Sequence, residues 1–108
     1  MLKVYNVEIT RQAHEQMLKI VNYITHELFA PDAALNLINK MENSISNLSQ
    51  FPRRYPLLEE EPWKSKGIRK MVIHHFLIYY WIDEPQKKVQ ITAIIYAGRN
   101  QLNQLKDI

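Results

Sequence analysis

The stretch that decides the fold is GIRKMVIHHFLIYYWI, residues 67–82. Two segments within it, 68–73 and 76–82, are rich in the β-branched and aromatic residues that favour extended backbone. We therefore predict two strands that are joined near His74 and His75. Because side chains alternate along a strand, the aromatic run in the second segment must place at least one ring in the core.

The chain on either side of this stretch extends the sheet. Residues 83–86 form a polar turn signal that contains a proline, and 89–96 predict a third strand. Three strands with short connections predict an antiparallel meander. Near the start of the chain, residues 3–9 alternate apolar with polar side chains, which predicts a further strand with one buried face.

Two helices are expected between the first strand and the meander. Thr10 offers a hydroxyl N-cap for the first helix, and Pro31 with Asp32 is typical of the start of the second. Phe51 and Pro52 end the second helix, because a proline disfavours helical backbone in the residue before it. The apolar stripes at helical spacing are Ala13, Met17, Ile20, Val21, Ile24 and Leu28, then Ala34, Leu37, Ile38, Met41, Ile45 and Leu48.

The order of the expected elements is β-α-α-β-β-β, an α+β fold. The connection between the helices is short, so we predict an antiparallel helical hairpin packed on one face of a curved, mainly antiparallel sheet. Ile24 and Met41 are expected to lie buried between the hairpin and the sheet. The length of 108 residues predicts one domain, 1–108.

Composition excludes several classes of protein. Hydrophobic residues make up 46% and charged residues 23%, which is ordinary for a folded domain and unlike a disordered chain. There is no cysteine, so disulfides and thiolate metal sites are excluded. His14 and His26 each precede a glutamate, but no second histidine follows at the zinc spacing, and we expect no metal and no cofactor. We read no signal peptide and no membrane span, and we expect a cytoplasmic protein.

The positive charges gather in one part of the chain. The formal net charge is only +3, yet six cations fall in the loop after the second helix and the strand that follows it. These are Arg53, Arg54, Lys64, Lys66, Arg69 and Lys70. If the start of the first meander strand and the end of the third share one end of the sheet, Arg69 and Arg99 would converge and would be able to clamp a phosphate or a carboxylate. Spacing alone favours separate surface cations. Trp63 is expected to anchor this loop to the fold.

The whole pattern resembles the RelE/ParE superfamily of bacterial type II toxins. The resemblance covers nearly the whole chain, and the order and spacing of its short motifs carry it. These motifs are Ile20-x-x-Tyr23-Ile24, Pro31-Asp32-Ala33-Ala34, Ile45-x-x-Leu48-x-x-Phe51-Pro52-x-x-Tyr55-Pro56, Glu61-Pro62-Trp63-x-x-x-Gly67-Ile68-Arg69, Leu77-Ile78-Tyr79-Tyr80 and Tyr96-Ala97-Gly98-Arg99-Asn100. The resemblance implies a small growth-inhibiting toxin that a cognate antitoxin neutralises.

Two branches of the superfamily imply different targets. The long helical hairpin and the Leu48-x-x-Phe51-Pro52 ending are similar to the ParE branch, whose members poison DNA gyrase and stabilise plasmids. The target-binding residues would then be Arg69, Arg99, Leu102 and Leu105. In the alternative RelE-like branch, the chain would be a ribosome-dependent mRNA endonuclease (an mRNA interferase). The catalytic residues would then be Lys64, Lys66, Arg69, Tyr96 and Arg99.

The residues themselves bear on this choice. RNA cleavage needs a general base and a general acid beside the phosphate-binding cations. Several related toxins carry a histidine where this chain has Ala97, so the acid–base set is incomplete. An inert binding module of the same fold remains a third possibility. For the antitoxin, we expect an amphipathic helix to bind an apolar patch on the hairpin made by Leu18, Phe29 and Leu35, with acidic side chains meeting the basic loop.

Overall fold

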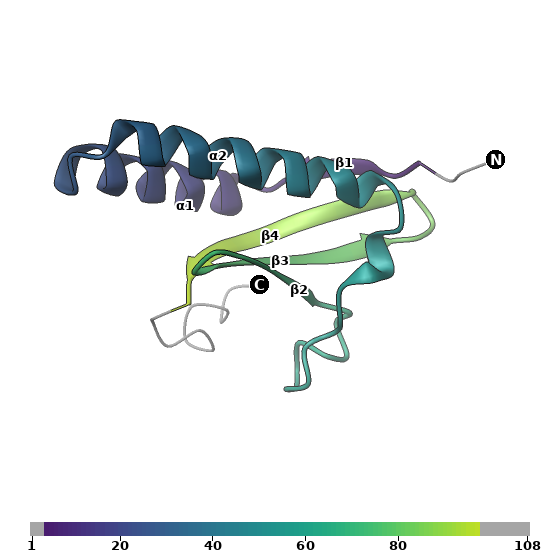
Figure 1. Ribbon diagram of the computed structural model, residues 1–108. Coiled ribbons are helices and arrows are strands. Elements are labelled where there is room, and N and C mark those ends of the chain that lie inside the picture. The colour runs from purple at the N-terminus through teal and green to yellow at the C-terminus, as the bar shows by residue number, and fades with distance from the viewer. Residues whose placement is uncertain (1–3, 98–108) are drawn as a thin grey trace.

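The computed structural model describes residues 4–97 and confirms the predicted order of elements. The elements are β1 (Asn6–Ile9), α1 (Arg11–Asn22), a π-helical turn (Tyr23–Glu27), α2 (Pro31–Ser46), 3₁₀ turns at Asn47–Ser49 and Pro52–Arg54, β2 (Arg69–Ile73), β3 (Phe76–Asp83) and β4 (Lys88–Tyr96). Arg99, Leu102 and Leu105 lie outside the described residues. Figure 1 shows both helices on one side of the sheet, with the turn between them projecting beyond the ends of the strands.

The strands form one mixed sheet in the order β1-β4-β3-β2. β1 runs parallel to β4, whereas the β2–β3 and β3–β4 pairs are antiparallel, as the meander predicts. β1 pairs only with residues 88–91 of β4. Beyond them, the side-chain Oε1 of Gln16 on α1 accepts a hydrogen bond from the Ile94 N–H (2.8 Å). Helix α1 therefore satisfies part of the β4 edge that β1 leaves open.

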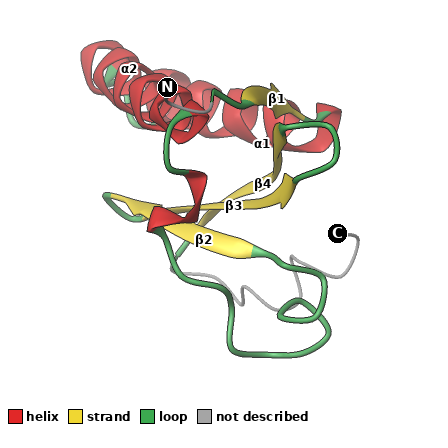
Figure 2. Cartoon of the chain, turned by 90° about the vertical axis from the view of Figure 1, so that its right-hand side faces the viewer, coloured by secondary structure: helices red, strands yellow, loops and turns green. Residues whose placement is uncertain are grey.

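The helical hairpin packs as its apolar stripes predict. Thr10 caps α1, because its hydroxyl accepts from the Ala13 N–H (3.2 Å). Met41 is 1% exposed, and Ile24 is partly buried against the same cluster. The helices lie over one face of the sheet (Figure 2), and residues from both layers contribute to this cluster. Its fully buried members are Tyr5, Ala13, Met17, Leu37, Met41, Ile45, Leu48, Met71, Ile73, Ile78, Tyr80, Val89, Ile91 and Ile94.

Leu28 departs from the prediction. It was expected in the apolar stripe of the first helix, but its side chain is 54% exposed. The last turn of that helix is π-helical, and the Leu28 N–H donates to the Tyr23 carbonyl, five residues back (3.2 Å). A π turn holds one more residue than an α turn, so it shifts the phase of the stripe and rotates Leu28 out of the core.

A second buried cluster lies on the opposite face of the sheet, which the one-sided prediction missed. It consists of Leu58, Ile68, Leu77, Tyr79, Ala93 and Ile95, with Trp63 and Trp81 packed against it. Trp63 therefore anchors its loop to the fold, as expected. The run of tyrosines is buried on both faces, with Tyr80 under the helices and Tyr79 in the second cluster.

A β-bulge in β4 allows this strand to serve both clusters. Tyr79 lies opposite Ala93 and Tyr80 lies opposite Ile91, so Thr92 is the extra residue. The bulge reverses the alternation of side chains, and the residues that face the helices change from odd to even positions. Within residues 4–97, no helix is long and apolar enough to cross a membrane. The same residues hold no group of three or more metal-ligating side chains.

Candidate functional site

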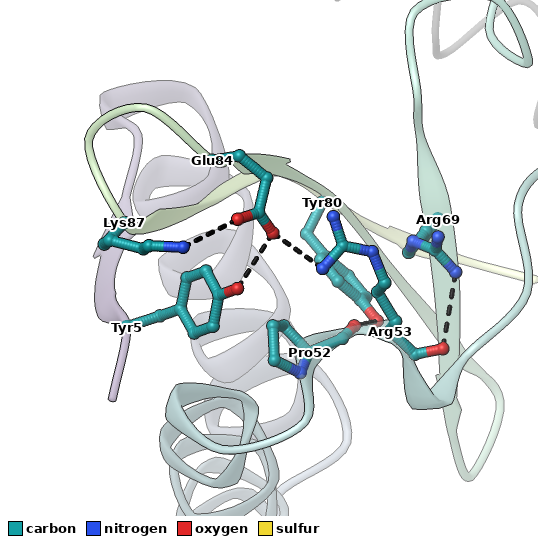
Figure 3. A network of polar contacts seen from close by, with 7 residues as sticks. All are labelled: Tyr5, Pro52, Arg53, Arg69, Tyr80, Glu84 and Lys87. Carbon is teal, nitrogen blue, oxygen red and sulfur yellow. Dashed lines mark hydrogen bonds and ion pairs between the residues drawn. The ribbon is translucent and has the colours of Figure 1, made fainter. Parts of the chain in front are cut away.

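Arg69, the first residue of β2, is bound to the loop that follows the helices. Its Nη1 donates hydrogen bonds to the carbonyl oxygens of Tyr55 (2.7 Å) and Arg53 (3.4 Å). Figure 3 shows the guanidinium facing this loop from the strand. Arg69 therefore holds the loop against the sheet, while its remaining N–H groups have no partner among the described residues.

Glu84, in the turn between β3 and β4, binds three polar groups, and two of them come from distant parts of the chain. Its Oε1 lies 2.6 Å from an Nη1 of Arg53 and accepts a hydrogen bond from the Tyr5 hydroxyl (2.8 Å). Its Oε2 pairs with Lys87 Nζ at 2.9 Å. Hydrogen bonds from Lys87, Tyr5 and Arg53 lower the pKa of Glu84 to about 2. The same carboxylate raises the pKa of Arg53.

Arg54 caps the helical segment that ends at Ser49. Its Nη2 donates to the carbonyls of Gln50 (2.6 Å) and Asn47 (3.2 Å), and its Nε donates to the carbonyl of Phe51 (3.2 Å). These carbonyls lie at or just beyond a helix C-terminus, where a cation is favourable. The basic cluster predicted from the sequence thus contains three arginines that each hold part of the fold.

The tyrosine hydroxyl beneath this loop completes the attachment. Tyr80 donates a buried hydrogen bond to the Pro52 carbonyl (2.7 Å; Figure 3). Burial raises the pKa of Tyr80 to about 12. The hydroxyl therefore stays protonated and remains a donor at neutral pH.

The register of the sheet separates residues that were expected to work together. Arg69 lies opposite Tyr80, which lies opposite Ile91. Tyr96 lies five residues after Ile91 along β4. At the usual rise per residue, this places Tyr96 about 16 Å from Ile91 along the strand direction. The premise that the start of the first meander strand and the end of the third share one end of the sheet is therefore wrong for the described residues. The reason is that alternate strands of an antiparallel meander, here β2 and β4, run in the same direction, so the start of one and the end of the other lie at opposite ends of the sheet.

Tyr96 instead lies beside the β2–β3 hairpin. Its ring is 5.6 Å from that of Phe76, and the Ala97 N–H donates to the carbonyl of His75 (2.8 Å). The end of β4 therefore adjoins the histidine pair and not Arg69. Arg99 follows outside the described residues, so its convergence with Arg69 stays a prediction.

Lys64 and Lys66 are exposed on the turn that covers the second face of the sheet. The Lys64 N–H donates to the Glu60 carbonyl (2.9 Å), and the Gly67 N–H donates to the Lys64 carbonyl (3.0 Å). Arg69 alternates in phase with Met71 and Ile73, which face the helices. The two lysines and Arg69 thus belong to different faces.

The predicted hairpin patch is exposed. Leu18, Phe29 and Leu35 all present large apolar side chains to solvent, and Leu28 and Tyr23 beside the connecting turn do the same. Between Lys19 and Lys40, the only acidic or basic residues besides His26 are Glu27 and Asp32. The outer end of the hairpin is therefore apolar with an acidic character.

The two exposed phenylalanines also have an unusual backbone conformation. Phe29 has φ 51° and is 85% exposed, and Phe51 has φ 55° and is 63% exposed. This left-handed conformation costs a residue with a side chain roughly 1–2 kcal/mol. Glycine is the usual residue at such a position after a helix. The Phe51-Pro52 pair predicted the end of a helix, but periodicity carries no signal for positive φ.

Glu84 and Tyr5 were also missed by the sequence reasoning. They are 79 positions apart, and each has an ordinary local setting in a turn or a strand. Only the fold brings them to Arg53.

Comparison with known proteins places the chain in a family. Residues 7–101 match the sequence model described as the ParE toxin of the type II toxin–antitoxin system parDE. A search of curated proteins finds no significant match. Among solved structures, a chain of the chromosomal ParDE toxin–antitoxin system from P. aeruginosa superposes with a TM-score of 0.70 at 20% identity, covering 87% of this chain and 97% of that one.

A second solved structure is the toxin–antitoxin complex RelBE2 from Mycobacterium tuberculosis. It gives a TM-score of 0.62 at 20% identity and covers 89% of this chain and 94% of that one. At such identity these likenesses show the shared fold, an α+β arrangement of two helices on a four-stranded mixed sheet. The family match spans most of the sequence, and the chain therefore belongs to the ParE toxin family of type II toxin–antitoxin systems.

Proposed function

We propose that this toxin stops growth by inhibiting DNA gyrase in the cytoplasm, without a cofactor, and that a cognate antitoxin protein neutralises it. The observation that carries the choice of target is the distance between Arg69 and Tyr96. An endonuclease needs its phosphate-binding cations and its acid–base groups around one phosphate. The register places Arg69 and Tyr96 about 16 Å apart along the sheet.

The target-binding surface is assigned to Arg69, Arg99, Leu102 and Leu105. Arg69 supports this surface because its guanidinium keeps donors available beyond its two bonds to the loop. The other three residues lie beyond the described part of the chain, and they are assigned from the sequence pattern alone. Association with a large enzyme, and not bond cleavage, would be the activity of this surface.

We assign the binding of the antitoxin to the hairpin patch made by Leu18, Phe29 and Leu35. Three exposed apolar side chains on a helical hairpin suit the apolar face of an amphipathic helix. Covering this patch would remove large apolar groups from water, which is the main favourable contribution to such an association. Acidic side chains of the same partner would meet Lys64 and Lys66.

One set of assays tests the proposed target. The chain is induced in bacteria, and growth, plasmid supercoiling and mRNA integrity are followed together. We expect arrested growth, loss of negative supercoiling and gyrase–DNA cleavage complexes, with intact mRNA. Codon-aligned cuts in mRNA would replace the gyrase proposal by the endonuclease, and unimpaired growth would indicate an inert binding module.

Three variants divide the proposed surface at matched expression. We expect truncation after Gln101 to reduce toxicity at least as much as Arg69→Ala or Arg99→Ala. The reason is that the truncation removes both leucines assigned to the target contact. Arginine variants that lose toxicity and mRNA cleavage together, with a truncated chain that stays toxic, would overturn the gyrase assignment.

A further inference from the structure

Phe51 is an exposed aromatic residue that the fold does not use. Its side chain is 63% exposed, and it makes no ring or cation–π contact within residues 4–97. Its backbone is left-handed, with φ 55° and ψ 55°. Glycine or asparagine adopts this conformation more easily than phenylalanine. A large apolar side chain that is exposed at a position favouring glycine is a candidate contact for a partner.

The surroundings of Phe51 are positively charged. Arg54 donates to the Phe51 carbonyl, and Arg69 donates to the carbonyls of Arg53 and Tyr55. Arg53 is paired with Glu84, but neither Arg54 nor Arg69 has a carboxylate within ion-pair distance in the described chain. Phe51 therefore belongs to a turn that Arg54 and Arg69 contact, and the described residues supply neither arginine with a carboxylate partner.

This surface is continuous with Arg69 and separate from the hairpin patch. Arg69 reaches the loop within two residues of Pro52, which directly follows Phe51. Phe29, in the hairpin patch, lies at the other end of α2, a helix of 16 residues with a length of about 24 Å. A partner on one end of this helix leaves the other end free.

We propose that Phe51 is the apolar anchor through which this toxin binds its target. It enters a hydrophobic pocket of gyrase that is rimmed by acidic side chains, and Arg54 and Arg69 face that rim. This inference rests on the proposed function, since it takes gyrase as the partner. Aromatic residues and arginine are enriched in protein interfaces, where a few such residues carry most of the binding energy. Charge complementarity between the arginines and an acidic rim sets the orientation of the complex.

The test uses Phe51→Gly with Phe29→Gly as a matched control. Both variants remove the same side chain from a left-handed position that glycine adopts readily, so both should fold. We measure thermal unfolding, the toxin concentration that half-inhibits purified gyrase, and affinity for the co-expressed antitoxin. We expect Phe51→Gly to raise the half-inhibitory concentration by about 10- to 100-fold while antitoxin affinity is retained. Phe29→Gly should show the reverse pattern.

Other outcomes separate this inference from the proposed function. If wild-type toxin fails to inhibit gyrase, both the proposed function and the role of Phe51 are wrong. If wild-type toxin inhibits but folded Phe51→Gly inhibits equally well, only the anchor is overturned. If Phe51→Gly loses antitoxin binding while its inhibition of gyrase is unchanged, Phe51 contacts the antitoxin. This result would also overturn the proposal that Phe51 binds gyrase. Phe51→Asn serves as a second variant, and failure of both to fold would show that Phe51 is structural.

Discussion

The two ends of helix α2 carry the same backbone feature in opposite settings. Each end adjoins an exposed phenylalanine with positive φ, Phe29 before the helix and Phe51 after it. Phe51 follows a helix end that Arg54 caps, and the adjoining loop is bonded to the sheet through Tyr80 and Arg69. Phe29 lies on a turn that projects beyond the strands (Figure 1), where the charged neighbours are acidic.

The difference shows how one element presents two unlike surfaces. Polar bonds fix the basic end, so a side chain there is held in place before any partner arrives and loses little entropy on binding. At the acidic end, backbone hydrogen bonds from Leu28 to Tyr23 and from Ala30 to Ile24 close the connection, and Ile24 is only partly buried against the core. We therefore expect this end to adapt more readily to a partner that lies along the hairpin. Four predictions test this contrast between a fixed end and an adaptable end.

The largest expected effect comes from the core under the fixed half of α2. Met41 is 1% exposed, so Met41→Ala should lower the free energy of unfolding by about 2–5 kcal/mol through lost burial and a cavity. Ile24, near the projecting turn, is only partly buried, and Ile24→Ala should cost about 1–2 kcal/mol. Urea unfolding measures the loss of free energy of unfolding in each variant. Equal losses in both variants would contradict the contrast between a fixed end and an adaptable end.

The next effect concerns the buried hydroxyl of Tyr80. Tyr80→Phe keeps the ring but removes the buried hydrogen bond that the hydroxyl donates to the Pro52 carbonyl. Leaving that carbonyl unpaired should cost about 1–3 kcal/mol. Tyr23→Phe, at an exposed position by the projecting turn, is the matched control and should leave the unfolding midpoint unchanged. If Tyr80→Phe also leaves the unfolding midpoint unchanged, the loop is held against the sheet without this hydrogen bond.

Glu84 should make the fixed end sensitive to acid. Its pKa falls from an ordinary 4.5 to about 2 in the folded chain. The ionised carboxylate therefore stabilises the fold above about pH 4.5 and loses this contribution as the pH falls toward 2. Melting temperatures of wild type and Glu84→Gln should differ at pH 7 and converge near pH 2. Glu42→Gln, an exposed change on α2, is the control, and its melting temperature should follow that of wild type over the whole pH range.

The smallest effect is expected for the phenylalanines themselves. Replacing Phe29 or Phe51 by glycine relieves the left-handed strain but adds freedom to the unfolded chain, and these terms nearly cancel. We expect changes within about 0.5 kcal/mol at either end. Differential scanning calorimetry measures both variants. A large loss in one of them would show that its ring packs in the fold.

The sequence predicts those features that repeat along the chain. Alternation and helical spacing are periodic, so the order of elements and the burial of Met41 follow from them. Leu28 departs from prediction because a π turn adds one residue to the period, and propensity carries no sign of it. The second cluster was missed because its cover is a loop whose apolar residues, among them Leu58 and Trp63, follow no period.

The candidate site was less predictable than the fold for a geometric reason. The cluster of cations was visible, but the partners that engage it lie far away in sequence, as Glu84 does for Arg53. The premise that the start of β2 and the end of β4 share one end of the sheet was wrong, because these two strands run in the same direction, whereas the convergence of Arg69 with Arg99 stays a prediction. The exposed hairpin residues Leu18, Phe29 and Leu35 were found, since a residue outside an apolar stripe faces solvent.

The bond from Gln16 to the Ile94 N–H has a consequence for how this toxin behaves at high concentration. An open strand edge is a template on which another chain can add a strand, and such additions propagate into fibres. A single side-chain amide removes one donor from that template on an otherwise apolar stretch of β4. We therefore expect this amide to disfavour the addition of a second chain at this edge, while both ends of α2 stay open to other proteins.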